Sequence, residues 1–326
     1  MILSRRLASG SNMIRSPVTL DLNLKSMVLT QFLAPYKWSL SIVHPMNLQD
    51  RFLMAGVMGW PVMHSRSPLM HNHWFAQEKL KGVYVPLAVQ PDNLEAALRG
   101  LHALGFAGCN LTIPHKQKAL QMVDEVDSVA QKMGAISCVA VKEDGRLVGS
   151  NNDAAGFIRN VKEFQPEWQA NRGPVVVIGA GGGSRAVCQG LIQEGATKIR
   201  LVNRNLERAQ NLMSELGQPI KAYPWTDRAD LMQGAAMVVN TTSQGMMGQT
   251  ALDIQLDLLP TDALVTDIVY TPLETPFLAQ ARMRGNATLN GLGMLLHQGP
   301  LGWKAWFGIE PKVTPELRKL LEQSLI

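Results

Sequence analysis

A glycine-rich turn between a buried strand and a helix constrains the fold of this chain more than any other stretch. Residues 175–178, Val-Val-Val-Ile, form a short apolar run that is typical of a strand buried on both faces. The turn that follows consists of Gly179, Ala180, Gly181, Gly182 and Gly183. A helix is predicted over residues 184–194 and a second strand from residue 199. Strand, turn, helix and strand fall within about thirty residues, as in a dinucleotide-binding β-α-β unit.

The five residues of this turn are suited to a diphosphate. Glycines let the backbone bend sharply and bring its N–H groups against an anion, and the following helix points its positive end at the same place. We therefore expect these residues to bind the pyrophosphate of a dinucleotide. The alternative is a tight strand-to-helix loop without a ligand.

The end of the second strand favours one cofactor over another. An NAD-binding unit is expected to carry Asp or Glu about twenty residues past the glycines, where it binds the ribose 2′-hydroxyl. This chain has Asn203-Arg204-Asn205 there, and no carboxylate at the strand end. Arg204 and Arg208 are four residues apart, and together they can bracket a 2′-phosphate. The pattern predicts NADP and leaves NAD open; the alternative is that both arginines are solvated surface groups.

Composition excludes several classes of protein. The chain has 326 residues and is 46% hydrophobic, which is enough for two cores. Its net charge of +5 comes from scattered residues without a basic run, so we expect no nucleic acid partner. No apolar run of about eighteen residues is present, so we expect no membrane span. The three cysteines have no Cys-x-x-Cys spacing, which predicts neither disulfide nor metal site and favours the reducing cytoplasm.

Residues 1–50 read as an N-terminal extension. The first 45 residues hold five basic side chains against one acid, Asp21, which weakly resembles a transit peptide. They show neither a clear apolar region nor a cleavage signature. We therefore interpret this extension as a disordered arm or an over-called start, with the working protein beginning near Met46.

Two serines and a strand supply polar groups in the first half of the chain. Ser65 and Ser67 lie beside the start of a helix that Pro68 opens, a place suited to a carboxylate, although one serine could serve only as a helix cap. On the strand that follows Gly105, alternation puts Asn110 and Thr112 on one face.

A lysine and an aspartate follow at the ends of their segments. Lys116 comes after the break at Pro114, and its alternative interpretation is a surface lysine. Asp153 lies near the domain boundary, where it either faces a cleft or caps the next helix. Strands are predicted over residues 133–140, 237–240 and 264–270, and a later helix returns to the first domain.

Four stretches together resemble the shikimate dehydrogenase family, which includes shikimate and quinate dehydrogenases. They are Gly59-x-Pro61-x-x-His64-Ser65-x-Ser67-Pro68-x-x-His71-Asn72, Asn110-x-Thr112-x-Pro114-x-Lys116, Asn151-Asn152-Asp153 and Gly291-Leu292-Gly293-Met294-Leu295-x-x-Gln298. The similarity extends from about residue 51 to the C-terminus.

The resemblance implies an α/β fold with two domains and an active-site cleft between them. An N-terminal open-sheet substrate domain would comprise residues 51–153 and 290–326, and a Rossmann-type NADP-binding domain would comprise residues 154–289. The implied reaction is the reversible NADP-dependent reduction of 3-dehydroshikimate to shikimate, a step toward chorismate and the aromatic amino acids. The implied partner is a small cyclic hydroxy acid, and the sequence leaves a monomer and a homodimer open.

The resemblance also assigns roles to individual residues. Lys116 and Asp153 would act at the reacting oxygen, which requires a group that exchanges a proton within about 3 Å of it. Which of the two holds the proton stays open, because burial and a neighbouring carboxylate act on a lysine in opposite directions. The implied substrate-binding residues are Ser65, Ser67, Asn110, Thr112, Ser137, Tyr270 and Gln298. Besides the glycine turn, the implied cofactor-binding residues are Asn203, Arg204, Asn205, Arg208, Ile268 and Gly291.

One position departs from the family pattern. Gly134-Ala135-Ile136-Ser137-Cys138 stands where the family usually has Gly-Ala-Val-Asn-Thr, so an asparagine contact to the ring falls to the shorter Ser137. Losing a polar contact can cost about 1–3 kcal/mol. This favours a divergent paralogue and keeps two alternatives open: a quinate/shikimate dehydrogenase that uses NAD, and a non-catalytic nucleotide-binding protein.

Overall fold

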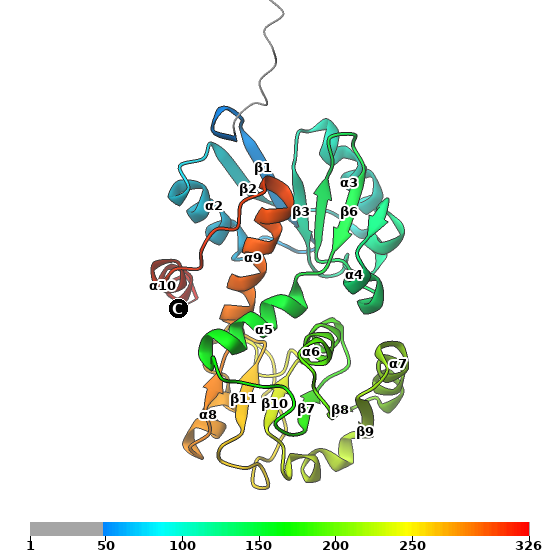
Figure 1. Cartoon of the computed structure of the whole chain (residues 1–326), viewed down its shortest axis with the longest axis vertical. Coiled ribbons are helices and arrows are strands. Elements are labelled where there is room, and N and C mark those ends of the chain that lie inside the picture. Colours follow the sequence, from blue (N-terminus) through cyan, green and yellow to red (C-terminus); the bar gives the residue numbers. More distant parts are fainter. Residues whose placement is uncertain (1–47, 326) are drawn as a thin grey trace, which may run out of the picture. The chain divides into compact units, whose positions relative to one another are not determined.

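The computed structural model describes residues 48–325, and Figure 1 shows the course of the chain through them. The prediction for residues 1–50 therefore lies almost wholly outside the described residues. From residue 47 onward the chain forms one compact unit. This unit contains two six-stranded sheets, which we call the first lobe and the second lobe.

The first lobe is built on a sheet of order β2-β1-β3-β5-β6-β4, in which only β5 runs antiparallel to its neighbours. Its strands are β1 (Leu53–Gly59), β2 (Gly82–Ala88), β3 (Gly108–Leu111), β4 (Glu125–Val126), β5 (Cys138–Val141) and β6 (Leu147–Ser150). Its helical segments are η1 (Leu48–Asp50), α2 (Ser67–Gln77), η2 (Pro91–Asn93), α3 (Leu94–Ala103), η3 (Lys118–Gln121) and α4 (Ser128–Met133), to which the C-terminal α9 (Leu292–Phe307) and α10 (Pro315–Gln323) are added.

The second lobe has a fully parallel sheet of order β12-β11-β10-β7-β8-β9. Its strands are β7 (Val175–Ile178), β8 (Ile199–Asn203), β9 (Ile220–Pro224), β10 (Met237–Asn240), β11 (Leu264–Asp267) and β12 (Thr288–Leu289). Its helical segments are α5 (Asp153–Phe164), α6 (Gly182–Gln193), α7 (Leu206–Leu216), η4 (Trp225–Arg228), η5 (Asp230–Met232) and α8 (Pro276–Met283). The expected α/β architecture is therefore present.

Strand β7 shows why its sequence is apolar at every position. Val175 and Val177 point into one core cluster of the second lobe, and Val176 and Ile178 point into the other. Helices cover both faces of this sheet, so the strand has no solvent-facing side. The predicted strand and helix are confirmed, with the helix beginning two residues earlier than expected, at Gly182.

Two strand predictions were wrong at one end. Residues 133–137 are not part of a strand, because α4 ends at Met133 and Gly134 caps it with a φ of 62°. Strand β5 begins only at Cys138. Strand β11 ends at Asp267, so residues 268–270 form an exit loop rather than the end of the strand.

Helices α5 and α9 pack closely where the chain passes between the lobes (Figure 1). A Cβ on Gly156 would lie 2.6 Å from Cγ of Gln298, and one on Gly293 would lie 1.7 Å from Oδ1 of Asn160. Glycine is needed at both positions because the helices approach so closely. Aromatic packing then fixes α9 on the first lobe, because the Phe75 ring of α2 lies 4.7 Å from the ring of Trp303 and 5.7 Å from that of Phe307, both on α9.

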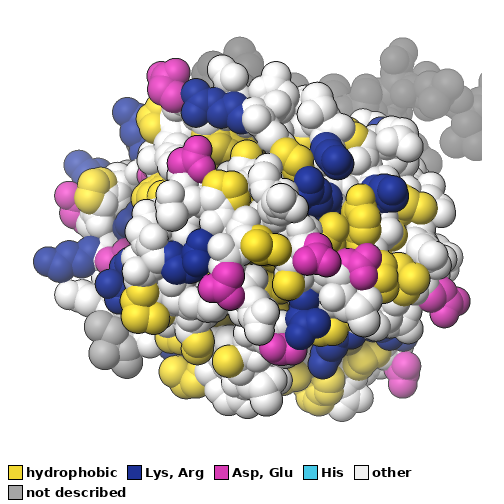
Figure 2. Space-filling view, turned by 90° about the horizontal axis from the view of Figure 1, so that it is seen from below, with side chains coloured by type: hydrophobic (Ala, Val, Ile, Leu, Met, Phe, Trp, Pro, Cys, Tyr) yellow, Lys and Arg dark blue, Asp and Glu magenta, His cyan; other side chains and the backbone are white. Residues whose placement is uncertain are grey.

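Charges are mixed on the surface at the lower end of Figure 1. Figure 2 shows this face with basic and acidic side chains interspersed among apolar ones, and no continuous basic surface on it. Within residues 48–325, no helix is long and apolar enough to cross a membrane. No group of three or more candidate metal ligands occurs in the same part of the chain.

Candidate active site

An ion pair between Lys116 and Asp153 marks the centre of the site. Nζ of Lys116 donates a hydrogen bond to Oδ2 of Asp153 at 2.6 Å. The Lys116 side chain is 29% exposed and that of Asp153 is 7% exposed, so the lysine reaches solvent while the carboxylate is buried. The second carboxylate oxygen, Oδ1, is buried without a hydrogen bond to any described residue. The pair therefore keeps one acceptor free for a further donor.

The turn before α5 holds Asp153 in place. Asp153 is the first residue of α5 and donates its backbone N–H to Oδ1 of Asn151 at 2.9 Å. Asn151 is anchored through its Nδ2, which donates to the carbonyl of Ala135 at 2.8 Å. The carboxylate of Asp153 makes no capping contact, so its alternative interpretation as a helix cap was wrong.

Ser137, which directly precedes β5, is hydrogen-bonded to the same turn. Its Oγ accepts the backbone N–H of Asn152 at 2.8 Å and lies 3.4 Å from Oδ1 of Asn151, to which it donates. The side chain is buried, and it also lines the pocket described next. One acceptor position of the hydroxyl is therefore used inside the protein.

A polar pocket opens beside the ion pair in the first lobe, and we call it the polar pocket. Lys116 and Asp153 lie on its wall. All seven residues predicted to bind substrate also line it: Ser65, Ser67, Asn110, Thr112, Ser137, Tyr270 and Gln298. They come from five separate segments of the chain, and Tyr270 is the one contributed by the second lobe.

Two hydrogen bonds within the protein fix the orientation of the Asn110 amide in the polar pocket. Its Oδ1 accepts the Tyr84 hydroxyl at 2.7 Å, and its Nδ2 donates to the carbonyl of Ser137 at 3.1 Å. The second N–H of this amide stays free. The sequence did not indicate a role for Tyr84. Its position predicts a residue of a β-strand, and no sequence pattern indicates that its hydroxyl contacts Asn110 on β3.

His71 lies in the wall of the same pocket and had no assigned role. Its Nδ1 accepts the indole N–H of Trp303 at 2.8 Å, and its ring stacks on Tyr84 with centroids 4.0 Å apart. Burial lowers the pKa of His71 to about 3. The ring is therefore neutral, with its proton on Nε2.

The glycine turn forms part of a second hollow, the central cleft, which also reaches Lys116 and Asp153. Ala180, Gly181 and Gly182 line this cleft. Gly181 precedes α6 and donates its N–H to Oγ of Ser184 at 3.1 Å. Gly182 is exposed and is the first residue of α6, where the backbone N–H has no partner within the helix and can meet an anion. Gly179 has a φ of 110°, and a Cβ there would lie 2.7 Å from Oγ1 of Thr241. The turn is therefore shaped as a phosphate site requires.

The residues at and after the end of β8 differ in whether they line the central cleft. Arg208 lines the central cleft. Asn203, Arg204 and Asn205 are not among the residues that line this cleft. Oδ1 of Asn205 caps α7 by accepting the N–H of Arg208 at 3.1 Å. Among residues 48–325, neither Arg204 nor Arg208 takes part in an ion pair with an acid.

Arg185 is a cleft residue that the sequence did not single out. It lies in the first turn of α6 and forms an ion pair with Glu215 of α7. Its Nη1 also donates to the carbonyl of Met133, at 3.4 Å, in the first lobe. Both charged residues line the central cleft, so this guanidinium connects the two lobes there.

A third hollow, the apolar groove, continues from the glycine turn between two exit loops. Gly183, Ile268 and Tyr270 line it, together with Met246 and Met247. Gly291 packs behind Ile268, where a Cβ would lie 2.0 Å from the Ile268 carbonyl oxygen. Ile268 thus lines the groove, and Gly291 packs against its backbone without lining the groove itself.

A phosphate-binding turn, a lysine–carboxylate pair in the same cleft and an apolar groove that adjoins this turn define a dehydrogenase that uses a pyridine dinucleotide. Two family models identify the family within this class of dehydrogenases. The "Shikimate dehydrogenase substrate binding domain" matches residues 57–139, and "Shikimate / quinate 5-dehydrogenase" matches residues 161–255.

Sequence relatives agree with these models. A protein of Paramagnetospirillum magneticum is 49% identical over 265 residues, which cover 81% of this chain and 96% of the relative. One of Rhodospirillum rubrum is 51% identical over 269 residues, covering 81% and 95%. Both are named shikimate dehydrogenase (NADP(+)). This chain belongs to the shikimate dehydrogenase family.

Solved structures confirm the expected fold class. A shikimate 5-dehydrogenase of Thermus thermophilus in complex with NADP(H) and shikimate matches with a TM-score of 0.75 and 33% identity, covering 84% of this chain and all of the other. A quinate dehydrogenase of Corynebacterium glutamicum in complex with NAD matches with a TM-score of 0.78 and 30% identity, covering 83% and 99%. The fold alone therefore does not distinguish the two acids or the two cofactors.

Proposed function

We propose that this chain catalyses the reversible NADP-dependent reduction of 3-dehydroshikimate to shikimate. The relatives named above carry this activity and cofactor in their names. The observation that carries the proposal is the position of the Lys116–Asp153 pair, which lines both the polar pocket and the cleft of the glycine turn. A proton donor there faces the substrate and the cofactor together.

Each end of the cofactor meets residues that fit it. The backbone N–H groups of Gly182 and Gly183 at the start of α6 would hold the pyrophosphate. Arg204 and Arg208 would hold the 2′-phosphate, and Asn203 and Asn205 shape the strand end that carries them. The apolar groove beside Ile268 would take the nicotinamide ring. When bound, NADPH supplies the hydride that adds to the carbonyl carbon of the substrate.

The protein supplies the proton. The ammonium of Lys116 donates a proton to the carbonyl oxygen as the electrons of the C=O π bond move onto it, and the neutral amine takes the proton back in the reverse direction. Oδ2 of Asp153 holds the amine in place at 2.6 Å. Its free Oδ1 accepts a hydrogen bond from a neighbouring hydroxyl of the substrate.

The polar pocket orients the ring. The hydroxyls of Ser65 and Ser67 at the start of α2 donate to the carboxylate of the substrate. Asn110, Thr112, Tyr270 and Gln298 contact its remaining oxygens. Asn110 acts as a donor, because the Tyr84 hydroxyl and the Ser137 carbonyl fix the orientation of its amide.

A second candidate function rests on Ser137. Its hydroxyl is bonded to the turn of Asn151 and Asn152, and a serine is shorter than the asparagine usual in the family. Fewer contacts to the ring favour a quinate/shikimate dehydrogenase, with NAD as the alternative cofactor. A non-catalytic nucleotide-binding role is disfavoured, since such a role needs no paired Lys116 and Asp153.

Initial rates decide among these functions. Oxidation of shikimate and of quinate would be followed at the nicotinamide absorbance with NADP and with NAD. We expect the highest kcat/KM for shikimate with NADP. A higher value for quinate or for NAD would replace the proposal, and no turnover with any pair would support the binding role.

We further propose the domain division predicted above, with boundaries at residues 153–154 and 289–290. The two sheets support it, since they comprise residues 53–150 and 175–289. We propose a cytoplasmic enzyme, because Cys109, Cys138 and Cys188 are all free and buried. Its partner is a small-molecule substrate, and sedimentation would decide between monomer and homodimer.

A further inference from the structure

A buried carboxylate lies behind the apolar groove, outside the residues assigned to the site. Asp267 is the last residue of β11 and is 0% exposed. Its Oδ1 accepts the N–H of Val269 and the amide of Asn240, each at 3.0 Å, and its Oδ2 accepts the Thr275 hydroxyl at 2.8 Å. One carboxylate thus joins the end of β10, the exit loop of β11 and the start of α8.

Asn240 passes this contact on to the exit loop of β10. Its Oδ1 accepts the backbone N–H of Thr242 at 3.0 Å and the Thr242 hydroxyl at 2.8 Å. Its Nδ2 donates to the carbonyl of Gln244 at 3.1 Å as well as to Asp267. Every hydrogen-bonding position of this amide near the loop is therefore used.

The two loops held in this way form opposite parts of the apolar groove. Residues 241–243 line it from β10, and residues 268–271 line it from β11. Tyr270 of the second loop also reaches the polar pocket. Neither Asp267 nor Asn240 lines any of the three hollows, so both act only through the loops.

A carboxylate is an unexpected choice for a purely structural position. No cation pairs with Asp267 among residues 48–325, and the nearby Glu274 is engaged with Arg282. Burial raises the pKa of Asp267 to about 6 despite its three hydrogen bonds. The ionised group is thus held where ionisation is unfavourable. What a carboxylate offers there, and an apolar residue does not, is acceptor capacity for donors from three segments.

We infer that Asp267 is a positioning residue for the nicotinamide side of the site: through Asn240 and Val269 it sets the spacing of the loops 241–244 and 268–270. This rests on the proposed function for the identity of the ligand in the groove. The contact to Thr275 lies on the far side of the carboxylate, toward α8, and serves stability.

Binding of NADPH to the purified full chain tests the inference. Asn240→Ala removes the link to the β10 loop, and Asp267→Asn leaves one acceptor oxygen where two were used. We expect about a tenfold rise in the Kd for NADPH, read by its fluorescence, in both variants. Thr275→Val removes the outer contact and also the N-cap of α8, where the Thr275 hydroxyl accepts the N–H of Leu278, so we expect a lower Tm with an unchanged Kd. Asp262→Asn, an exposed acid before β11, is the matched control.

The outcomes separate the inference from the proposed function. Unchanged Kd values in Asn240→Ala and Asp267→Asn would overturn the inference, as would an equal rise in Thr275→Val. If Asp267→Asn does not fold, Asn240→Ala decides alone. Because binding is read without turnover, absence of shikimate oxidation in the parent chain would count against the proposed function only.

Discussion

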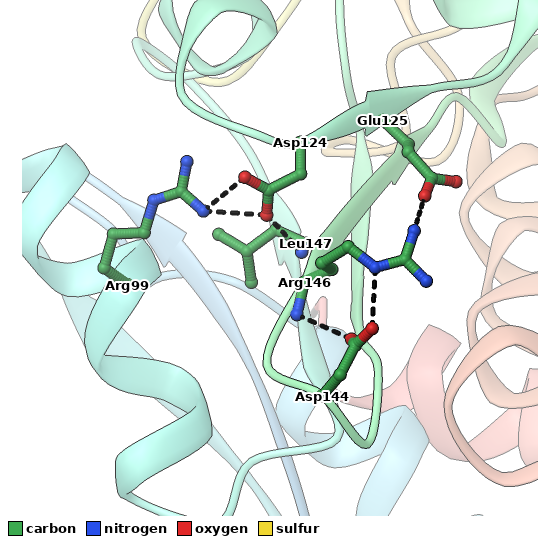
Figure 3. A network of polar contacts seen from close by, with 6 residues as sticks. All are labelled: Arg99, Asp124, Glu125, Asp144, Arg146 and Leu147. Carbon is green, nitrogen blue, oxygen red and sulfur yellow. Dashed lines mark hydrogen bonds and ion pairs between the residues drawn. The ribbon is translucent and has the colours of Figure 1, made fainter.

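The Lys116–Asp153 pair and the ion-pair network on the first lobe use the same chemical groups in different settings. The cleft pair has one amine, one carboxylate that is 7% exposed, and an unused acceptor oxygen. The surface network, shown in Figure 3, has side chains that are 32–55% exposed. Its members are Arg99, Asp124, Glu125, Asp144 and Arg146, with the backbone of Leu147.

In the surface network every acid is satisfied by its neighbours. The backbone N–H of Leu147 and the guanidinium of Arg99 hold the pKa of Asp124 below its usual value, and Arg146 does the same for Asp144. Asp144 and Glu125 in turn raise the pKa of Arg146. Asp124, Asp144 and Arg146 therefore keep their charges at neutral pH. The comparison teaches that reactivity comes from incomplete pairing in a sheltered place and not from the ion pair itself.

Replacing the cleft lysine should produce the largest effect. Lys116→Ala removes the proton donor but leaves the polar pocket intact, so we expect kcat to fall about 10³-fold with little change in KM for shikimate. Steady-state rates measure this, and the exposed Lys118→Ala, two residues away, serves as control. Equal rates in the two variants would remove Lys116 from the chemistry and end the contrast with the surface.

Asp267 sharpens the comparison, because it is a carboxylate with no cation at all. Its pKa rises from 3.8 to about 6 on burial, so the folded state binds a proton more tightly than the unfolded state. This costs roughly 3 kcal/mol of stability at pH 7, a cost absent below about pH 4 and complete above about pH 6. We expect Asp267→Asn to abolish this dependence. Denaturant unfolding of both chains between pH 4 and pH 7 measures it, and parallel curves would contradict it.

The arginines at the end of β8 test whether exposed charges can still matter when a ligand completes them. Arg208→Ala should raise KM for NADPH about 10- to 100-fold, because the 2′-phosphate loses its guanidinium partner. KM for NADH should stay unchanged, because NADH has no 2′-phosphate. Arg204→Ala should act in the same direction with a smaller effect, as its side chain lies outside the cleft lining. Arg172→Ala, an exposed arginine without an ion pair, is the control.

An equal change of KM for both cofactors in these variants would mean that Arg208 supports the fold of α7 and has no part in cofactor choice. The placement of Arg208 in the cleft is what favours the first outcome.

Local patterns account for what the sequence could predict. The glycine turn, Ser65 and Ser67, and the segment from Asn110 to Lys116 each lie within one stretch, so local patterns singled them out and the family resemblance assigned their roles. The uninterrupted apolar run of β7 and the glycine turn after it indicated a buried strand of the parallel sheet in the second lobe.

The support of the site escaped prediction because it depends on contacts between distant segments. Tyr84 reaches Asn110 across 26 residues, and Asp267 reaches Asn240 across 27. The hydroxyl of Ser137 is used by the backbone of Asn152, which no side-chain pattern reveals. Residues 133–137 were expected in a strand, whereas Gly134 ends a helix there.

A substitution in the surface network should give the smallest effect, and it tests the exposed counterpart of the Lys116–Asp153 pair. Arg146→Ala leaves Asp144 and Glu125 without a guanidinium, but water solvates both, and exposed ion pairs contribute little. We expect Tm to fall by no more than about 2 °C, kcat to stay unchanged, and the difference in Tm to vanish at about 1 M salt, where the screening length is about 3 Å. Thermal melts at low and high salt measure this. A large fall in Tm that does not depend on salt would show that the network stabilises the fold. Exposure to solvent would then not explain the difference between this network and the cleft pair.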